Sequence, residues 1–302
     1  MLAVGDADIV VAGGVENMTR GPWVMSKASK PFGRDSQMHD SSFGWRFINP
    51  KLKKIYGVDG MGVTAENLVD LHGISREDQD AFAYNSQMKA TLARDQSILA
   101  EEIVHVAIPI RKQDDMIFQH DEFIRSGTTL DILSKLRPAF RKEGGSVTAG
   151  NASGLNDGSA ALLFANEQGL KSQGLEPLAE IISSAVVGVE PRIMGIGPVK
   201  ASEMALKRAG LTFSDLDVIE LNEAFSAQAL ACIRSWGIAD DDARINPNGG
   251  GISLGHPLGM TGSRILLTAA KQLKRTGGKY GLVTLCIGVG QGYAVIIKNT
   301  AV

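Results

Sequence analysis

The apolar and polar positions of the chain change pattern at about residue 145. Beyond that point, short apolar runs alternate with amphipathic segments of helical period. The expected strands are residues 159–165, 179–187, 218–221, 281–286 and 293–298, and the expected helices are residues 199–209, 222–236 and 256–274. Strands that alternate with helices in this way predict a layered α/β fold.

The first apolar run begins only eight residues into the sequence. Residues 9–14 read Ile-Val-Val-Ala-Gly-Gly, which predicts a strand buried on both faces. Such strands belong inside parallel sheets, where each parallel neighbour needs a crossover of a dozen or more residues. We therefore expect this strand to pair with later segments, or with residues that precede this sequence.

Residues from about 20 to 145 have a less regular pattern, which we interpret as an excursion from the sheet. Two helices are expected within it, one starting near Thr64 and one starting at Ser75. The second begins with Ser75-Arg-Glu-Asp78, a capping box, and is expected to run to about Asp95. Alternating residues at 103–108 predict a short strand.

Charge and cysteine content exclude several classes of protein. Lys and Arg number 31 against 33 Asp and Glu, and no dense basic run occurs, so we expect no nucleic-acid partner. The apolar runs fall far short of the roughly 20 residues of a membrane span, so we expect no membrane association. Neither Cys-x-x-Cys nor His-Glu-x-x-His occurs, which argues against a metal site. Two cysteines form no disulfide framework, and we expect a cytoplasmic location.

Two glycine-rich turns carry residues capable of chemistry. His256 follows the segment Asn246-Pro-Asn-Gly-Gly-Gly-Ile-Ser-Leu-Gly, and Cys286 precedes Ile-Gly-Val-Gly-Gln-Gly292. Structural alternatives are a helix-capping histidine and a cysteine that fills the core. The glycine spacing after Cys286 differs from a dinucleotide fingerprint. Cys232 shares one helical face with apolar residues, so we assign it to the core.

Two further polar segments accompany these turns. Asn222 follows an expected strand directly, where it serves either as a helix N-cap or as a group that holds a water or an oxyanion. Residues 148–158, Thr-Ala-Gly-Asn-Ala-Ser-Gly-Leu-Asn-Asp-Gly, form a turn of small residues. Next to the other turns, it is expected to line a groove for a thin, extended ligand.

These motifs together resemble the thiolase family. The ordered blocks that carry the resemblance are Gly5-Asp-Ala-Asp with Ala12-Gly-Gly-Val-Glu-Asn-Met18, residues 148–158, Asn222-Glu-Ala-Phe225, Asn246 to Pro257, and Cys286 to Gly292. The resemblance covers essentially the whole chain and implies the layered αβαβα thiolase fold. On this basis, residues 1–172 are expected to be an incomplete N-terminal half, including the excursion at about 20–145, and residues 173–302 the C-terminal half.

The resemblance implies thiolysis of a 3-oxoacyl-CoA by CoA, or the reverse Claisen condensation. His256 would activate the nucleophilic thiol and line an oxyanion hole with a water held by Asn222, Cys286 would shuttle the proton, and the Gly288 N–H would contribute to a second oxyanion hole. A thiol of pKa near 8.5 needs such a neighbouring base at neutral pH. The expected substrate- and CoA-binding residues are Ala149, Ser153, Phe140, Phe225 and Met61.

Three segments resemble 3-oxoadipyl-CoA thiolases of aromatic-compound catabolism, rather than thiolases that favour short acetoacetyl substrates. They are Gly21-Pro-Trp-Val-Met-Ser-Lys, Phe43-Gly-Trp-Arg-Phe-Ile-Asn-Pro and Pro191-Arg-Ile-Met-Gly-Ile-Gly-Pro. Fatty acid β-oxidation is a further process that the resemblance to thiolases implies. In thiolases that favour acetoacetyl substrates, a histidine commonly precedes the methionine found here as Met61. Gly60 occupies that position in this chain.

In the family, the acyl-carrying cysteine lies just before the Gly-Asp-Ala-Asp segment, and this sequence begins too late to contain it. We therefore expect a fragment that lacks on the order of a hundred residues, about one domain, and is inactive alone. The alternatives are a non-catalytic paralogue that binds CoA or pairs with intact subunits, and a ketoacyl synthase, which usually has histidine in place of Cys286. CoA acts as a substrate, no permanently bound cofactor is expected, and a full-length chain is expected to form a homodimer or homotetramer.

Overall fold

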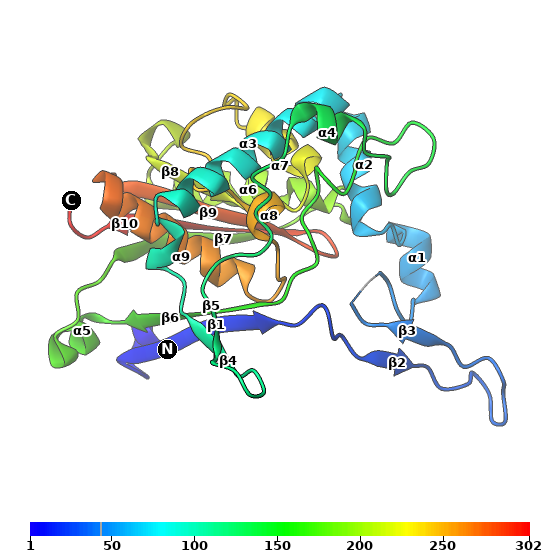
Figure 1. The fold of residues 1–302 in the computed structure, drawn as a ribbon, viewed down its shortest axis with the longest axis horizontal. Coiled ribbons are helices and arrows are strands. Elements are labelled where there is room, and N and C mark those ends of the chain that lie inside the picture. The colour runs from blue at the N-terminus through cyan, green and yellow to red at the C-terminus, as the bar shows by residue number, and fades with distance from the viewer. Residues whose placement is uncertain (43) are drawn as a thin grey trace.

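A computed structural model describes residues 1–42 and 44–302 (Figure 1). Phe43, which belongs to one of the motifs above, lies outside the described residues. The strands are β1 (Ile9–Glu16), β2 (Trp23–Met25), β3 (Met38–Asp40), β4 (Val106–Ile108), β5 (Met116–Phe118), β6 (Gly158–Ala165), β7 (Ala179–Gly188), β8 (Val218–Leu221), β9 (Tyr280–Ile287) and β10 (Gln291–Asn299). The α-helices are α1 (Pro50–Tyr56), α2 (Met61–His72), α3 (Arg76–Asp95), α4 (Leu130–Ser134), α5 (Glu167–Gln173), α6 (Gly197–Ala209), α7 (Ser226–Ser235), α8 (Gly251–Leu254) and α9 (Thr261–Thr276). Short 3₁₀ turns occur at Leu2–Val4, Leu99–Glu101, Pro191–Ile196 and Phe213–Asp215.

A four-stranded sheet in the order β7-β10-β9-β8 forms the centre of the molecule. β10 pairs antiparallel with both β7 and β9, whereas β8 and β9 run parallel. Helices α6 and α7 lie on one face of this sheet, and α9 lies on the other (Figure 1). The expected alternation of strands and helices after residue 145 is thus confirmed.

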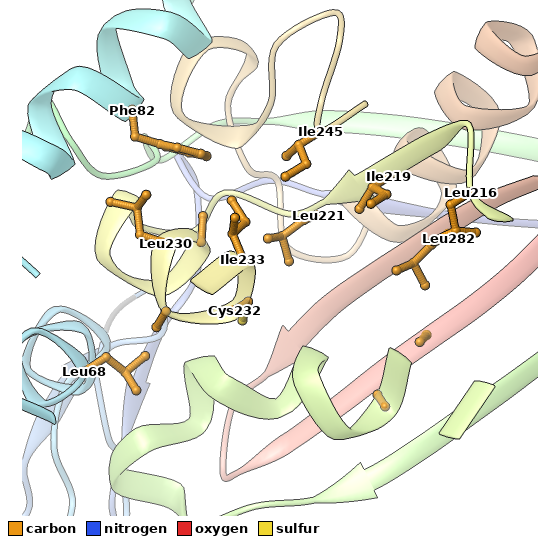
Figure 2. Packing of buried hydrophobic residues seen from close by; sticks show 14 of the residues in the cluster. Leu68, Phe82, Leu216, Ile219, Leu221, Leu230, Cys232, Ile233, Ile245 and Leu282 are labelled. Carbon is orange, nitrogen blue, oxygen red and sulfur yellow. The ribbon is translucent and has the colours of Figure 1, made fainter. Parts of the chain in front are cut away.

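The larger core lies between α7 and the sheet. Every residue of β8 is buried, and Ile219 and Leu221 pack against Leu230 and Ile233 of α7 (Figure 2). Burying a side chain of this size is worth about 1.5–3 kcal/mol. Cys232 belongs to the same cluster and is fully buried, which confirms its assignment to the core.

Helix α9 is sandwiched between the four-stranded sheet and the pair β1–β6. Its apolar stripe, which includes Ile265, Ala269 and Leu273, packs in a second core against strands β8 to β10. The opposite side of the helix faces β1–β6. Because Gly14 has no side chain, β1 comes so close to Gly259 that an added Cβ would lie 1.7 Å from its carbonyl oxygen. Glycine therefore permits β1 to support the chain just before α9.

The prediction that the first strand is buried on both faces inside a parallel sheet is wrong. β1 pairs antiparallel with β6, and these two strands form a separate two-stranded sheet. Within the described residues, α9 covers only one face of the pair. On the other face, Val11 and Val15 are 70% and 73% exposed, and Leu163 is 57% exposed.

The excursion at about 20–145 contains more helix than its irregular pattern suggests. The capping box of α3 is confirmed, because Ser75 and Asp78 each accept a hydrogen bond from the other's backbone N–H. Helix α2 begins at Met61 rather than near Thr64, and the strand expected at 103–108 is reduced to Val106–Ile108. The start of α2 differs because Gly60, not Thr64, is the extended N-cap residue of this helix.

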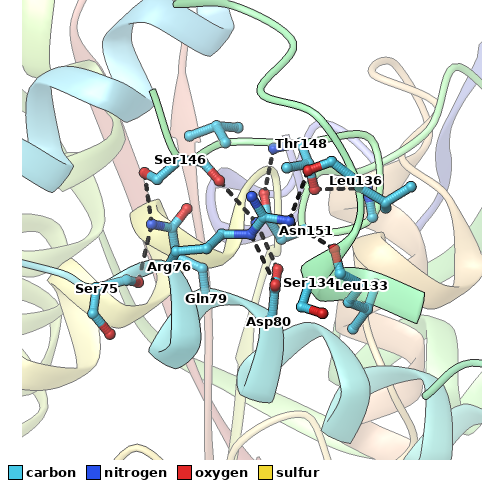
Figure 3. Close-up of polar contacts among 12 residues, drawn as sticks. Ser75, Arg76, Gln79, Asp80, Leu133, Ser134, Leu136, Ser146, Thr148 and Asn151 are labelled. Atoms are coloured by element: carbon cyan, nitrogen blue, oxygen red, sulfur yellow. Dashed lines mark hydrogen bonds and ion pairs between the residues drawn. The ribbon is translucent and has the colours of Figure 1, made fainter. Parts of the chain in front are cut away.

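A buried polar network fixes α3 to the turn at residues 146–153 (Figure 3). The Asp80 carboxylate pairs with Arg76 at 2.8 Å and accepts a hydrogen bond from Asn151 Nδ2 at 3.0 Å. Asn151 Oδ1 in turn accepts the backbone N–H of Thr148 at 2.7 Å. Since both partners of each buried bond are present, the network holds the turn in one conformation. No helix within residues 1–42 or 44–302 is long and apolar enough to cross a bilayer.

Candidate active site

Asn222 lies at the carboxyl end of β8, and its side chain is almost completely buried. Its backbone N–H donates to Thr284 O of β9 at 3.0 Å, so this residue is still hydrogen-bonded to the sheet. Helix α7 begins only at Ser226, with Phe225 as its N-cap. The expected helix start at 222 and the N-cap alternative for Asn222 are therefore wrong, because Phe225, three residues further on, is the N-cap residue of α7.

His256 lies in the connection between α8 and α9. The expected helix at 256–274 starts five residues later, at Thr261, so His256 does not cap it. The ring bridges two side chains: Nε2 is 3.2 Å from Asn222 Nδ2, and Nδ1 is 2.8 Å from Thr261 Oγ1. Burial, helped by the positive charge of Arg264, lowers the pKa of His256 to about 4. The imidazole is therefore neutral at pH 7 and can accept a proton.

The carboxylate of Glu223 organises the glycine-rich turn that leads to His256. It accepts hydrogen bonds from Ser86 Oγ at 2.6 Å, Asn246 Nδ2 at 2.7 Å and the Ile252 N–H at 3.2 Å. A Cβ at Gly250 would lie 2.3 Å from this carboxyl group, so the close approach needs glycine there. Glu223 thus links β8, α3 and α8 around the site.

Cys286 lies near the end of β9, the strand that pairs in parallel with β8. Because the two strands are parallel, their carboxyl ends lie at the same edge of the sheet. The Thr284 carbonyl accepts the Asn222 N–H there, and Cys286 follows two residues later on β9. The thiol is buried, and burial raises its pKa to about 12. The chain then turns through Gly288 and Val289, which has a φ of +69°.

The structure thus joins Asn222 directly to His256 and brings Cys286 to the same edge of the sheet on the neighbouring strand. Strand alternation directs the Cys286 side chain to the α7 side, where Cys232 is buried. Burial raises the pKa of the Cys232 thiol, and the nearby Cys286 adds to this rise. Two points stay predictions. The first is that His256 and Cys286 meet at one thioester, and the second is that the Gly288 N–H binds an oxyanion.

The residues expected to contact CoA lie around the start of α7. The Phe140 and Phe225 rings form an edge-to-face pair with centroids 5.9 Å apart. Phe140 also packs on Gly62, where an added Cβ would lie 2.0 Å from the ring, next to the exposed Met61. An aromatic surface therefore connects α2 to the Asn-Glu-Ala-Phe segment.

The small-residue turn joins the same surface. The Ser153 N–H donates to Ala224 O at 3.0 Å, and Ala152 forms a β-bridge with Phe225. Ser153 is half-buried and Ala149 is exposed. The two motifs, about 70 residues apart in sequence, are thus adjacent in space, although contact with CoA stays a prediction.

Sequence reasoning missed Thr261, Glu223 and Arg264. Glu223 belongs to the Asn-Glu-Ala-Phe motif, so its position beside Asn222 was a usable signal. Thr261 contacts His256 only because the chain turns at Pro257, and Arg264 is brought near the ring by α9. Within the described residues, no group of three or more His, Cys, Asp or Glu side chains is placed to hold a metal ion.

Comparison with known protein families gives two matches. The model of the thiolase N-terminal domain matches residues 1–168, and that of the thiolase C-terminal domain matches residues 175–299. The chain is 54% identical over 298 residues to a beta-ketoadipyl-CoA thiolase of Acinetobacter baylyi. It is 52% identical to a 3-oxoadipyl-CoA/3-oxo-5,6-dehydrosuberyl-CoA thiolase of Escherichia coli. Each alignment covers 99% of this chain and 74% of the relative.

Solved structures show the same fold. Human mitochondrial 3-ketoacyl-CoA thiolase superimposes with a TM-score of 0.89 and 42% identity, covering 98% of this chain and 73% of the human chain. The structure of the human enzyme in complex with CoA gives a TM-score of 0.88 at the same identity, with 98% and 72% coverage. The layered arrangement expected from the sequence is therefore confirmed.

Proposed function

Because the chain belongs to the thiolase family, we propose that it serves thiolysis of a 3-oxoacyl-CoA by CoA, with 3-oxoadipyl-CoA as the favoured substrate. The observation that carries the proposal is the contact between Asn222 and His256 at the sheet edge where the strand of Cys286 ends. Relatives named for 3-oxoadipyl-CoA support the substrate. Cleavage between its carbons 2 and 3 releases acetyl-CoA and succinyl-CoA.

The His256 ring is neutral at pH 7, so one ring nitrogen has a free lone pair that can accept a proton. Its Nε2 would take the proton of a nucleophilic thiol, and the resulting thiolate would attack the 3-oxo carbon. Asn222 would hold a water that, together with the ring, stabilises the oxygen of the thioester as it becomes an enolate. Cys286 would protonate the α-carbon of the departing acetyl-CoA carbanion in thiolysis and remove a proton from the same carbon in condensation. The Gly288 N–H would stabilise the tetrahedral intermediate.

CoA is proposed to bind as a substrate, with no permanently bound cofactor. Its extended pantetheine chain would follow the surface formed by Ser153, Ala149, Phe140, Phe225 and Met61, where two motif segments and α2 meet. The human 3-ketoacyl-CoA thiolase that shares the fold was solved in complex with CoA, which supports CoA as a ligand.

Neither cysteine of the 302 residues suits the role of acyl carrier. Cys232 is fully buried in the α7 core, and burial raises the pKa of Cys286 to about 12. A thiol of such high pKa supplies little thiolate at pH 7. We therefore propose that the 302 residues alone bind CoA without turning over 3-oxoacyl-CoA.

The test combines calorimetric CoA binding with mass-spectrometric detection of acetyl-CoA and succinyl-CoA after incubation with 3-oxoadipyl-CoA and CoA. CoA binding without product is expected, with binding weakened by Phe225→Ala. If product forms, is lost in His256→Asn and persists in the exposed control His105→Asn, the result would support the proposed thiolase site. The same result would refute the proposal that the chain alone is inactive. Absence of both binding and product would refute the proposed function.

A non-catalytic role in pairing with an intact thiolase subunit is the second candidate. It is favoured by the β1–β6 pair, whose Val11, Val15 and Leu163 side chains are exposed. Mixing the chain with an intact 3-oxoadipyl-CoA thiolase and separating the products by gel filtration tests it. Co-elution that is lost in Val11→Lys would support pairing, whereas separate elution would exclude it.

A further inference from the structure

The hydroxyl of Thr261 is fixed against the His256 ring. Thr261 is completely buried as the first residue of α9, and its Oγ1 lies 2.8 Å from Nδ1 of His256. The same oxygen lies 2.9 Å from the carbonyl oxygen of Pro257. One side chain thus bridges the imidazole and the backbone turn that follows it.

A hydroxyl group has only one proton, so its two contacts cannot both be donated. Thr261 Oγ1 donates to Pro257 O, which leaves only lone pairs for His256. Nδ1 must then donate its proton to Thr261, and Nε2 must carry the lone pair. The contact therefore selects one of the two neutral tautomers of the ring.

The opposite side of the ring gives the same assignment. Nε2 lies 3.2 Å from the Asn222 amide nitrogen, which only donates. A proton on Nε2 would place two donors against each other. The protons therefore run in one direction, from Asn222 to Nε2, from Nδ1 to Thr261, and from Thr261 to Pro257.

A competing arrangement exists, because the Pro257 carbonyl also accepts the backbone N–H groups of Met260 and Thr261, at 3.1 Å and 3.0 Å. If these two bonds satisfy the carbonyl, the hydroxyl is free to turn and donate to Nδ1. The proton would then sit on Nε2, and the Asn222 amide would have to rotate by half a turn. The two arrangements differ in which ring nitrogen is protonated, which is directly measurable.

We propose that Thr261 is a positioning residue that holds His256 in the tautomer protonated on Nδ1, so that Nε2 is the nitrogen available to accept a proton. A neutral hydroxyl orients the ring as the carboxylate of a catalytic triad does, but adds no negative charge that would raise the pKa of the ring. This inference deepens the proposed function, because the role of Nε2 as base belongs to it. The tautomer itself does not depend on that function.

The test is ¹⁵N NMR of the 302-residue chain labelled on its histidine rings, at pH 7. The chain has five histidines, and His256→Asn assigns the signals of interest by their disappearance. A protonated Nδ1 and an unprotonated Nε2 are expected. Thr261→Val, which keeps the shape and removes the hydroxyl, should shift the tautomer ratio toward Nε2–H by about tenfold, the effect of losing one hydrogen bond. Thr261→Ser should restore the original ratio.

Protonation of Nε2 in the unmodified chain would overturn the inference, as would a Thr261→Val spectrum identical to that of the unmodified chain. If Thr261→Val fails to fold, as judged by circular dichroism, Thr261→Ala is the substitute and Thr261→Ser remains the matched control. The readout is independent of turnover. If the chain shows the expected tautomer but neither binds CoA nor forms product, this inference stands and the proposed function is refuted. If the chain binds CoA but has its proton on Nε2, the proposed function stands and this inference is refuted.

Discussion

The carboxyl group of Glu220 on β8 makes part of the stability of this chain depend on pH, and Glu220→Gln should remove that part. The side chain is 1% exposed, and its Oε1 has no hydrogen-bond partner within the described residues. Arg264 lies 3.8 Å from Oε2, which is too far for a direct hydrogen bond. Burial raises the pKa of Glu220 from 4.5 to about 8, and the positive charge of Arg264 offsets only part of this rise.

The sign of the effect follows from where the proton is held. Between pH 4.5 and about 8, the folded chain keeps a proton on Glu220 that the unfolded chain releases. The contribution to the free energy of unfolding is therefore complete below pH 4.5 and is lost as the pH rises toward 8. Each pH unit costs about 1.4 kcal/mol, so stability should fall by about 3 to 4 kcal/mol from pH 5 to pH 8 through this group.

Urea unfolding followed by circular dichroism at pH 5, 6, 7 and 8 measures this contribution as a difference between variants. The difference is needed because His256, whose pKa is lowered to about 4, has the opposite pH dependence. Its contribution to the free energy of unfolding is lost as the pH falls below 6.5. Glu220→Gln should match the unmodified chain at pH 5 and exceed it increasingly toward pH 8. Glu203→Gln, at an exposed position of α6, should follow the unmodified chain throughout. A Glu220→Gln variant that is less stable at pH 8, or that keeps the original pH dependence, would refute the reasoning.

Two further pairs of substitutions test the core and the close approaches, each by urea unfolding. Leu230→Ala should lower the free energy of unfolding by about 2–5 kcal/mol because it opens a cavity in the α7 core, whereas Leu71→Ala at an exposed site should change it by less than about 0.5 kcal/mol. Equal effects would contradict the packing described. Gly292→Ala should destabilise the chain, since the new Cβ would lie 2.1 Å from a backbone oxygen. Gly262→Ala, in open space on α9, should instead stabilise it by up to about 1 kcal/mol; a neutral Gly292→Ala would count against the close contact.

The sequence by itself determined the family and most of the C-terminal elements. The short strand Val218–Leu221 and the strand that carries Cys286 are recognisable because short, mainly apolar runs bounded by glycine or polar residues favour a buried strand. The start of α3 was equally clear, because the Ser75 capping box is a local interaction that needs no distant partner. The motif residues Asn222, His256 and Cys286 were identified for the same reason, since each stands in a distinctive local run of residues.

Only the tertiary structure decided how far the helices extend and what the first strand contacts. Asn222 stays outside α7 because its backbone N–H bonds to Thr284, 62 positions away. The helix after His256 begins only at Thr261. The sequence of the run beginning at Ile9 fits a strand with one buried face as well as a strand with two buried faces. Packing against α9 decides which face of this strand is covered. Hydrogen-bond partners such as Thr261 and Glu223 likewise depend on how distant segments meet. Local propensity cannot encode these contacts, because their energies exist only once the chain has folded.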